Sequence, residues 1–330
     1  MISVEHLTKY YGDFKAVDDL SFEIEEGHVY GFLGPNGAGK STTMNIITGC
    51  LSATEGRITI GGHDILDEPK EAKKLIGYLP EQPPLYLNET PQEYLTFVAQ
   101  AKGVKKADLE QEINSVVSQT GIDGVRFQLI STLSKGYRQR VGIAQALLGN
   151  PGVIILDEPT VGLDPIQIIE IRDLIKNLGR SHTVIFSSHI LSEVRAICDR
   201  IMIISSGRLV AFDTPENLET IMAGTNEIDI KAICSSEMAE SIASGVDGIS
   251  EVVFKDLEDG TVQGVITAAD DDLRGLCCRL FFAFADNRVP VYELNIKKAN
   301  LEDVFIELTE NQEPEIIPED IPESEKEDEN

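Results

Sequence analysis

The chain has 330 residues, which is long enough for two folded units that each bury a core of their own. Its composition, 42% apolar and 25% charged, is that of a globular protein, and no apolar run approaches the roughly 20 residues of a membrane-spanning helix. The formal net charge of −28 argues against a nucleic-acid partner, because most of this surface would repel a phosphate backbone. The first residues alternate apolar and polar like a strand and lack the regions of a signal peptide, so we expect a cytoplasmic chain.

Three short strand-like segments open the chain, at residues 2–7, 19–24 and 29–33, and the third runs directly into a glycine-rich segment. That segment is a complete Walker A motif, with the residues Gly34, Pro35, Asn36, Gly37, Ala38, Gly39, Lys40, Ser41 and Thr42. Glycines let the backbone wrap around a β-phosphate, and the helix predicted to start near Gly39 adds its positive end. We therefore predict an ATP site in which Lys40 reaches the β- and γ-phosphates, Ser41 ligates Mg²⁺ and Thr42 bonds the α-phosphate.

A second part of the site is predicted at the end of an apolar run, residues 152–156, which is typical of a buried parallel strand. Two acids, Asp157 and Glu158, follow it, and the carboxyl end of such a strand faces the ligand crevice of an open α/β sheet. Asp157 can hold Mg²⁺ through a water, and Glu158 can polarise the water that attacks the γ-phosphate. The alternative is that the two acids only cap the next segment.

The segment Leu133–Arg140 reads LSKGYRQR and resembles the signature LSGGQ-x-Q-R of the ABC transporter family. A serine at a helix N-terminus forms a second phosphate-binding nest. In that family the signature of one subunit closes over the ATP of another, so the resemblance implies head-to-tail pairing, with Ser134, Lys135 and Gly136 on the partner's ATP. Lys135 and Tyr137 depart from the usual signature, which bears on the rate and coupling of hydrolysis.

Two more motifs match the same family. Asp164 lies in a segment, residues 159–164, that resembles the D-loop, which signals across the dimer interface. Asp164 and Pro165 also suit the N-cap and first turn of a helix through Leu178. His189 follows the predicted strand at residues 183–187 and matches the family's switch histidine, which contacts the γ-phosphate.

Weaker matches complete the predicted nucleotide site. Tyr11 falls where the family places an aromatic side chain that stacks on adenine, with Val17 on the same face and Tyr10 as the alternative if the register slips. In the Q-loop, Glu81 stands where the family usually has Gln, and Gln82 comes next. The resemblance implies that Glu81 or Gln82 approaches Mg²⁺ and the attacking water.

The resemblance covers residues 1 to about 224. It implies an α/β P-loop NTPase cassette with a RecA-like core sheet, an antiparallel β subdomain and a helical subdomain at about residues 88–150. Within the last, Thr90 and Glu93 form a predicted capping box, and a helix is expected from Asp108 to Thr120 with its end at Gly121. In the family this subdomain receives a coupling helix from a membrane permease. The variant signature is similar to that of a bacterial export subfamily.

Residues 225–310 are predicted to form a small α+β accessory domain of ferredoxin-like βαββαβ order, with a helix added at residues 300–309. Its strands are expected at 227–233, 249–257, 261–267 and 290–296, and its helices at 237–243 and 272–284. Residues 311–330 are rich in acids and prolines, which predicts a disordered tail.

These features together predict an ATPase that binds ATP and Mg²⁺ and pairs with a second copy or a related ATPase subunit. The resemblance implies integral membrane permease subunits as further partners and a position on the cytoplasmic face of the membrane. Two alternatives remain: a regulatory or nucleic-acid or ribosome clamp of the same family, and a nucleotide-gated binding protein that rarely hydrolyses. The acidic surface and the single cassette weigh against the clamp, and Glu158 and His189 weigh against the binder.

Overall fold

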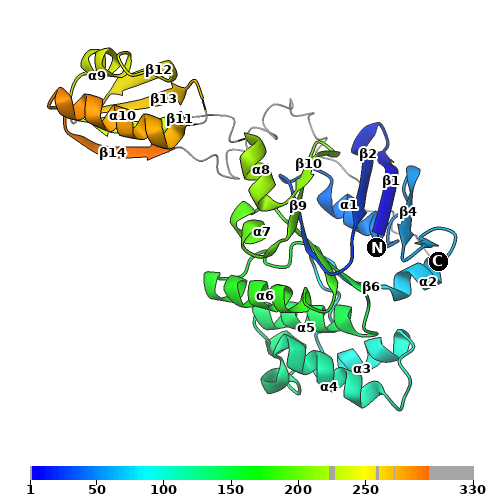
Figure 1. Ribbon diagram of the computed structural model, residues 1–330. Helices are drawn as coiled ribbons and strands as arrows, with labels where there is room; N and C mark the ends of the chain where they lie inside the picture. The colour runs from blue at the N-terminus through cyan, green and yellow to red at the C-terminus, as the bar shows by residue number, and fades with distance from the viewer. Residues whose placement is uncertain (1, 223–226, 258–259, 271, 297–330) are drawn as a thin grey trace. The chain divides into compact units, whose positions relative to one another are not determined.

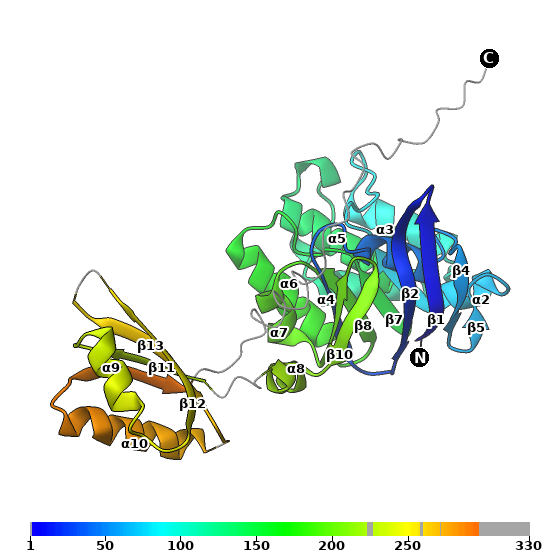
Figure 2. The ribbon, with the colours of Figure 1, turned by 90° about the horizontal axis from the view of Figure 1, so that it is seen from above.

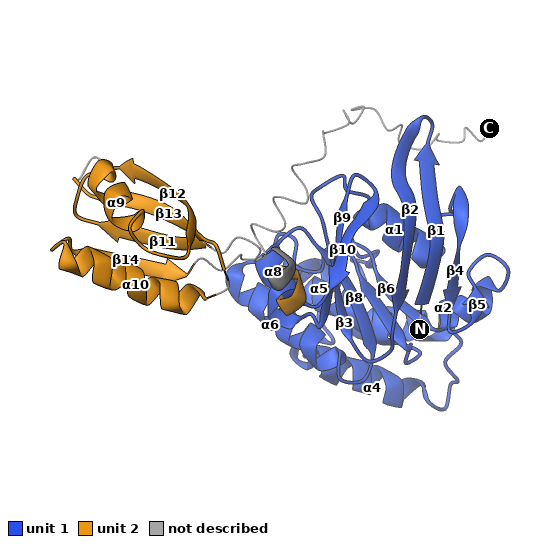
Figure 3. Cartoon of the chain, turned by 45° about the horizontal axis from the view of Figure 1, so that its top comes forward, with its two compact units in different colours: residues 1–215, 305–330 blue, residues 216–304 orange. Residues whose placement is uncertain are grey.

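The computed structural model describes residues 2–222, 227–257, 260–270 and 272–296. These residues fall into two compact units, unit 1 up to residue 215 and unit 2 from residue 216 (Figure 3). The division comes earlier in the chain than the expected boundary at residue 224. The helix expected at residues 300–309 and the acidic tail at 311–330 lie outside the described residues.

Unit 1 is built around a six-stranded sheet with the strand order β10-β9-β3-β8-β7-β6, in which only the β9–β10 pair is antiparallel. Its strands are β3 (Val29–Leu33), β6 (Ile76–Leu79), β7 (Val153–Leu156), β8 (Thr183–Ser188), β9 (Arg200–Ser205) and β10 (Arg208–Asp213). Every residue of β3 and β7 is buried, which explains why both read as continuous apolar runs. Leu33 pairs with Ser188 and Leu156 with Phe186, so the segments that follow β3, β7 and β8 meet at one edge of the sheet.

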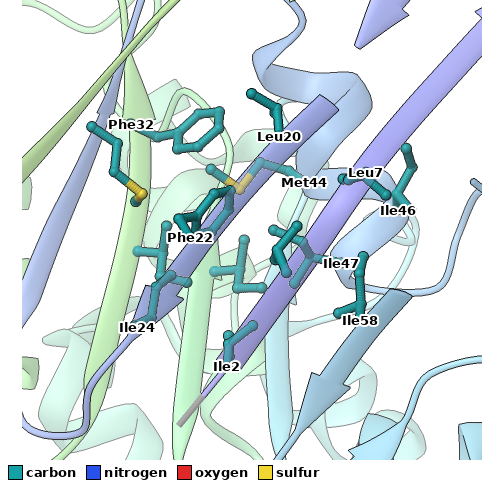
Figure 4. Close-up of a cluster of buried hydrophobic side chains, with 14 of the residues drawn as sticks. Ile2, Leu7, Leu20, Phe22, Ile24, Phe32, Met44, Ile46, Ile47 and Ile58 are labelled. Atoms are coloured by element: carbon teal, nitrogen blue, oxygen red, sulfur yellow. The ribbon is translucent and has the colours of Figure 1, made fainter. Parts of the chain in front are cut away.

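A four-stranded antiparallel sheet of order β2-β1-β4-β5 forms a second layer of unit 1 (Figure 2). Its strands are β1 (Ile2–Tyr11), β2 (Phe14–Ile24), β4 (Glu55–Ile60) and β5 (His63–Asp64). Its apolar side chains share one buried cluster with helix α1 (Lys40–Ile47) and the core sheet. Figure 4 shows Leu20 and Phe22 of this sheet close to Met44 of α1 and Phe32 of β3. The cluster fixes α1, and with it the loop before α1, against both sheets.

The helical part of unit 1 consists of α3 (Pro91–Ala101), α4 (Leu109–Thr120) and α5 (Lys135–Leu147), which pack against one another (Figure 1). The predicted capping box is confirmed, since the Thr90 side chain accepts a hydrogen bond from the Glu93 N–H and the Glu93 carboxylate accepts one from the Thr90 N–H. Gly121 ends α4 with a φ of 66°, as expected of a glycine C-cap. The remaining helical segments of unit 1 are α2 (Pro69–Lys74), the 3₁₀ turns Asp123–Val125 and Ile130–Thr132, α6 (Pro165–Leu178) and α7 (Leu191–Ile197). Helix α8 (Pro215–Met222) begins at the boundary between the units, and its residues from 216 on belong to unit 2.

Unit 2 has the predicted βαββαβ order and an antiparallel sheet of strand order β12-β13-β11-β14. Its elements are β11 (Glu227–Ala232), α9 (Ser236–Ala243), β12 (Ile249–Asp256), β13 (Val262–Ala268), α10 (Leu273–Asp286) and β14 (Val291–Ile296). Alternate residues of β11 are buried, and they join Leu276, Leu280 and Phe284 of α10 in a core separate from that of unit 1. Across the described ranges of both units, no helix is long and apolar enough to span a bilayer.

Candidate active site

The glycine-rich segment between β3 and α1 forms a loop whose shape depends on glycine. Gly37 and Gly39 have φ angles of 82° and 98°, in the left-handed region that glycine adopts without strain. A β-carbon at Gly39 would lie 2.5 Å from the carbonyl oxygen of Ala16, so a larger residue does not fit there. Because α1 begins directly after this loop, the free N–H groups of its first turn and its positive end are available to an anion.

Lys40, the first residue of α1, folds back over the loop. It is 6% exposed, and its Nζ donates hydrogen bonds to the carbonyl oxygens of Gly34 at 2.8 Å and Pro35 at 3.2 Å. The same Nζ lies 3.4 Å from Oε1 of Glu158. The start of α1 and the segment just after β7, which are far apart in the sequence, are therefore in direct electrostatic contact.

The two acids after β7 have different surroundings. Asp157 is 2% exposed, and its Oδ1 accepts a 2.6 Å hydrogen bond from the Ser187 hydroxyl. Burial is the main cause that raises the pKa of Asp157, while hydrogen bonds from Ser187 and Ser41 oppose the shift. Glu158 has a φ of 46°, which is uncommon for a residue with a side chain, and its N–H donates to the Ser187 hydroxyl at 2.8 Å.

His189 follows β8 directly and lies beside Glu158. Its Nδ1 is 3.0 Å from Oε2 of Glu158, whereas the other carboxylate oxygen faces Lys40. Glu158 is 7% exposed, but the His189 side chain keeps 40% of its surface exposed. The Glu158 carboxylate is thus held from both sides, and the imidazole is open to a ligand.

Lys40, Glu158 and His189 meet in one cavity of about 450 Å³, whereas Asp157 is not among the described residues that line it. Its lining includes the predicted site residues Tyr11, Asn36, Gly37, Gly39, Lys40, Ser41, Thr42, Glu81, Glu158 and His189. Phe14, Ala16 and Val161 line it as well and did not stand out in the sequence. Phe14 could have been noticed as a second aromatic residue close after Tyr11, whereas Ala16 and Val161 carry no recognisable signal.

Some predicted residues do not line the cavity. Gly34, Pro35 and Ala38 belong to the loop but contribute no lining surface, and Gln82 is exposed outside the cavity. Val17 is fully buried in the core, contrary to the expected contact with adenine, and Ala16 takes its place. The physical reason is a bulge in β2, where pairing with β1 passes from Lys9–Val17 to Tyr10–Lys15 and interrupts the alternation of sides. The Tyr10 ring instead lies 5.3 Å below the Lys15 ammonium.

Ser134, Lys135 and Gly136, which are expected to act on a partner's nucleotide, are not among the described residues that line this cavity. Neither is Asp164, which is expected to signal across the dimer interface. Ser134 is the N-cap of α5, and its hydroxyl accepts a 3.3 Å hydrogen bond from the Tyr137 N–H. The Lys135 side chain lies over Gly162, where a β-carbon would collide with the Lys135 ammonium. The start of α5 is therefore in contact with the loop that follows β7 in the same chain.

Oxygen donors suited to Mg²⁺ gather where α1 approaches β7. Ser41 is near enough to the Asp157 carboxylate to lower its pKa, and both Ser41 and Glu81 contribute to the cavity that holds the phosphate-binding loop. Mg²⁺ prefers hard oxygen ligands and is usually bound by one or two side chains together with water and substrate phosphates. The residues present therefore fit a magnesium ion that arrives with a nucleotide.

Known proteins with similar sequences are ATP-binding proteins of ABC transporters, in keeping with a cavity built around a phosphate-binding loop. A family model described as ABC transporter matches residues 17–161. The chain is 36% identical over 313 residues to the uncharacterized ABC transporter ATP-binding protein YhcH of Bacillus subtilis, with 94% of this chain and 96% of that protein covered. It is 32% identical over 310 residues to the linearmycin resistance ATP-binding protein LnrL of Bacillus subtilis, with 94% and 98% covered.

Among solved structures, the chain is similar to the ATP-binding cassette MJ0796, which is a dimer in a post-hydrolysis state bound to ADP and Pi. The TM-score is 0.59 at 27% sequence identity, and the match covers 65% of this chain and 98% of that one. This likeness and the sheet order of unit 1 confirm the cassette fold predicted from the sequence. The chain therefore belongs to the ABC transporter family, as one of its ATP-binding and ATP-hydrolysing subunits.

Proposed function

We propose that this chain pairs head-to-tail with a second ATPase subunit, encloses two Mg-ATP between the subunits, and uses their hydrolysis to drive a separate membrane permease. The observation that carries the proposal is the separation of two nucleotide-binding elements within one chain. The cavity contains the phosphate-binding loop, Glu158 and His189, whereas Ser134 lies at the start of α5 and does not line it. A second subunit is needed to bring a signature segment to this cavity.

The proposed chemistry assigns one role to each charged group. Lys40 exchanges its present carbonyl partners for the β- and γ-phosphates, which releases its contact with Glu158. Glu158 then orients and polarises the attacking water, and His189 holds the γ-phosphate from the open side of the cavity. Ser41, and Asp157 through a water, would hold Mg²⁺ near Glu81, and the ion would supply positive charge to offset the charge that develops on the phosphates.

The wider assignments rest on the family and remain part of this proposal. Residues 1–224 serve as the cassette, 225–310 as an accessory domain and 311–330 as an acidic tail. The helical part of unit 1 receives the permease on the cytoplasmic face of the membrane, and nucleic acid is not a partner. Transport in the export direction is supported by the variant signature and by the likeness to a linearmycin resistance protein.

The test is Mg²⁺-dependent ATP turnover of the purified chain as a function of its concentration, compared with Glu158→Gln. We expect turnover per subunit to rise with concentration, because two subunits complete the site, and to fall at least about 100-fold in the variant. The variant should still form ATP-dependent dimers, because the carboxamide keeps the shape of the side chain.

Glu71→Gln is the matched control, since Glu71 is an exposed acid that pairs with Lys74 and does not line the cavity. It should hydrolyse ATP at the wild-type rate. Unchanged turnover in Glu158→Gln would overturn the assignment of Glu158. Turnover per subunit that does not depend on concentration, with no dimer in ATP, would overturn the head-to-tail pairing.

A further inference from the structure

One buried acid of unit 1, Glu193, does not line the cavity and has no role in the proposed chemistry. Glu193, in the first turn of α7, is 1% exposed. Its Oε2 accepts two hydrogen bonds, one from the Thr160 hydroxyl at 2.7 Å and one from the Ser188 hydroxyl at 3.0 Å. A single carboxylate oxygen thus joins three separate segments of the chain.

The two hydroxyls belong to the segments that carry the proposed catalytic groups. Thr160 stands two residues after Glu158, and Ser188 stands immediately before His189. These segments are also joined directly by Ser187, which bonds Asp157, and by the contact between His189 and Glu158. Glu193 of α7 supplies a third link between the segments that follow β7 and end β8, through a side chain that does not line the cavity. The Ser188 hydroxyl also accepts a 3.0 Å hydrogen bond from the Ile190 N–H, which continues the link to the residue after His189.

The surroundings of Glu193 do not favour it as a simple packing residue. Its other oxygen, Oε1, has no hydrogen-bond partner, and neither has Nε of Arg172, the cation whose Nη2 lies 3.7 Å from Oε1. A buried acid with incomplete pairing costs stability, and an apolar side chain of similar volume is often as stable or more so. The two good hydrogen bonds to Thr160 and Ser188 are therefore the feature that an apolar residue could not supply.

We propose that Glu193 is a positioning residue for ATP hydrolysis, which fixes Thr160 and Ser188 so that Glu158 and His189 keep their mutual geometry. The inference rests on the function proposed above, in which these two groups act on the γ-phosphate. Glu193 itself is not among the described residues that line the cavity. Its loss should therefore slow turnover without weakening the binding of ATP.

The first test compares Glu193→Met with Glu193→Gln in the full chain. Methionine fills a similar volume but accepts no comparable hydrogen bonds, whereas the glutamine carbonyl can accept from both hydroxyls. We expect kcat to fall at least about 10-fold in Glu193→Met, with KM for ATP and the affinity for a non-hydrolysable analogue changed less than about 3-fold. Glu193→Gln should recover kcat to within about 3-fold of the wild type.

A double-mutant cycle separates positioning from general damage. If Glu193 acts through Thr160, then Thr160→Val lowers kcat in the wild-type background but adds little in the Glu193→Met background. Ser192→Ala, at the exposed neighbouring position of α7, is the control and should leave kcat unchanged. Independent effects of Glu193→Met and Thr160→Val on kcat, or equal kcat in Glu193→Met and the wild type, would overturn the proposal.

A second measurement does not depend on turnover. Hydrogen exchange of the nucleotide-free protein should be faster in Glu193→Met than in Glu193→Gln at the amides of Val161 and Ile190, which lie beside the two hydroxyls. Exchange that is the same in both variants would also count against the proposal. Failure of the proposed function would look different, because the wild type itself would then not hydrolyse ATP, or Glu158→Gln would not impair it.

Discussion

Gly39 and Glu158 both adopt a positive φ, but for different reasons. At Gly39 the left-handed backbone and the nearby Ala16 carbonyl leave room only for a hydrogen, so steric exclusion of a β-carbon requires glycine there. At Glu158 the same kind of backbone carries a long charged side chain, and the strain is held by the Ser187 hydroxyl that accepts its N–H. Strain at a residue that must present a carboxylate to a ligand is consistent with a functional requirement rather than a folding one.

Gly39→Ala tests the phosphate-binding loop. The substitution adds left-handed strain of about 1–2 kcal/mol and a collision with a backbone carbonyl, so we expect a loss of at least about 2 kcal/mol in the free energy of unfolding. Affinity for ATP should fall at least about 10-fold, because the loop must open. Gly27→Ala is the control, since Gly27 has a φ of 81° but nothing within 4 Å of its added β-carbon. Urea unfolding and nucleotide titration of both variants measure the difference, and equal effects would contradict the steric account.

At the scale of elements, two side chains that are proposed to act across a subunit interface lie at the N-termini of helices. Asp164 is the N-cap of α6, and its Oδ1 accepts from the N–H groups of Ile166 at 3.0 Å and Gln167 at 2.9 Å. Ser134 has the same position at α5. In both cases the side chain that is proposed to act across a subunit interface already has a structural task within its own chain.

Two substitutions of Asp164 separate these tasks. Asp164→Ala removes the cap and should lower the free energy of unfolding by about 1 kcal/mol, whereas Asp164→Ser keeps a capping oxygen and should cost only a few tenths. Chemical denaturation measures this difference. If Asp164 also acts between subunits, both variants lose turnover to a similar extent. If turnover falls in Asp164→Ala but not in Asp164→Ser, in parallel with their stabilities, Asp164 acts only as the N-cap of α6.

The contact between the two sheets of unit 1 is predicted to depend on pH. A hydrogen bond from Lys15 is the main cause that lowers the pKa of Asp18, burial opposes it, and Arg208 at the start of β10 lowers it further. Because the folded pKa lies below the usual 3.8, this contribution to stability is present above pH 3.8 and is lost as the pH falls through the folded value. Asp18→Asn should therefore be slightly less stable than the wild type at pH 7, with the gap closing below pH 3.8. Urea midpoints at a series of pH values test this, and a gap that widens in acid would contradict it.

At the scale of the whole molecule, two separate cores predict two unfolding events. The core of unit 2 contains Phe284, which is fully buried, and it shares no residue with the cluster around Phe32 in unit 1. Phe284→Ala should destabilise unit 2 by about 3–5 kcal/mol and leave the transition of unit 1 and the ATP turnover unchanged. Phe32→Ala should destabilise unit 1 and leave the unfolding transition of unit 2 unchanged. Calorimetry of the full chain measures both transitions, and one transition that shifts as a whole in either variant would contradict the prediction.

The sequence predicted the fold well where patterns are local. Apolar runs predict the buried strands, including the one before the phosphate-binding loop, and alternation predicts the order of elements in unit 2. Cap residues predict the capping box at Thr90. Val17 was misplaced because a bulge in β2 depends on pairing with β1, which the residues themselves do not reveal. Glu193 gave no signal at all, since a glutamate in the first turn of a helix is normally at the surface, and only the packing of α7 buries it.

The strand order of the core sheet has a consequence for the time at which this protein becomes functional during synthesis. The central strand β3 pairs only with β8 and β9, so residues 29–33 find no neighbour in the sheet until residues 183–205 have left the ribosome. Antiparallel pairing of β1 with β2 involves nearby residues and can form much earlier. The phosphate-binding segment, residues 34–42, is therefore expected to lack its supporting sheet while residues 43–205 are synthesised, and the ATP site can form only once β8 and β9 have paired with β3.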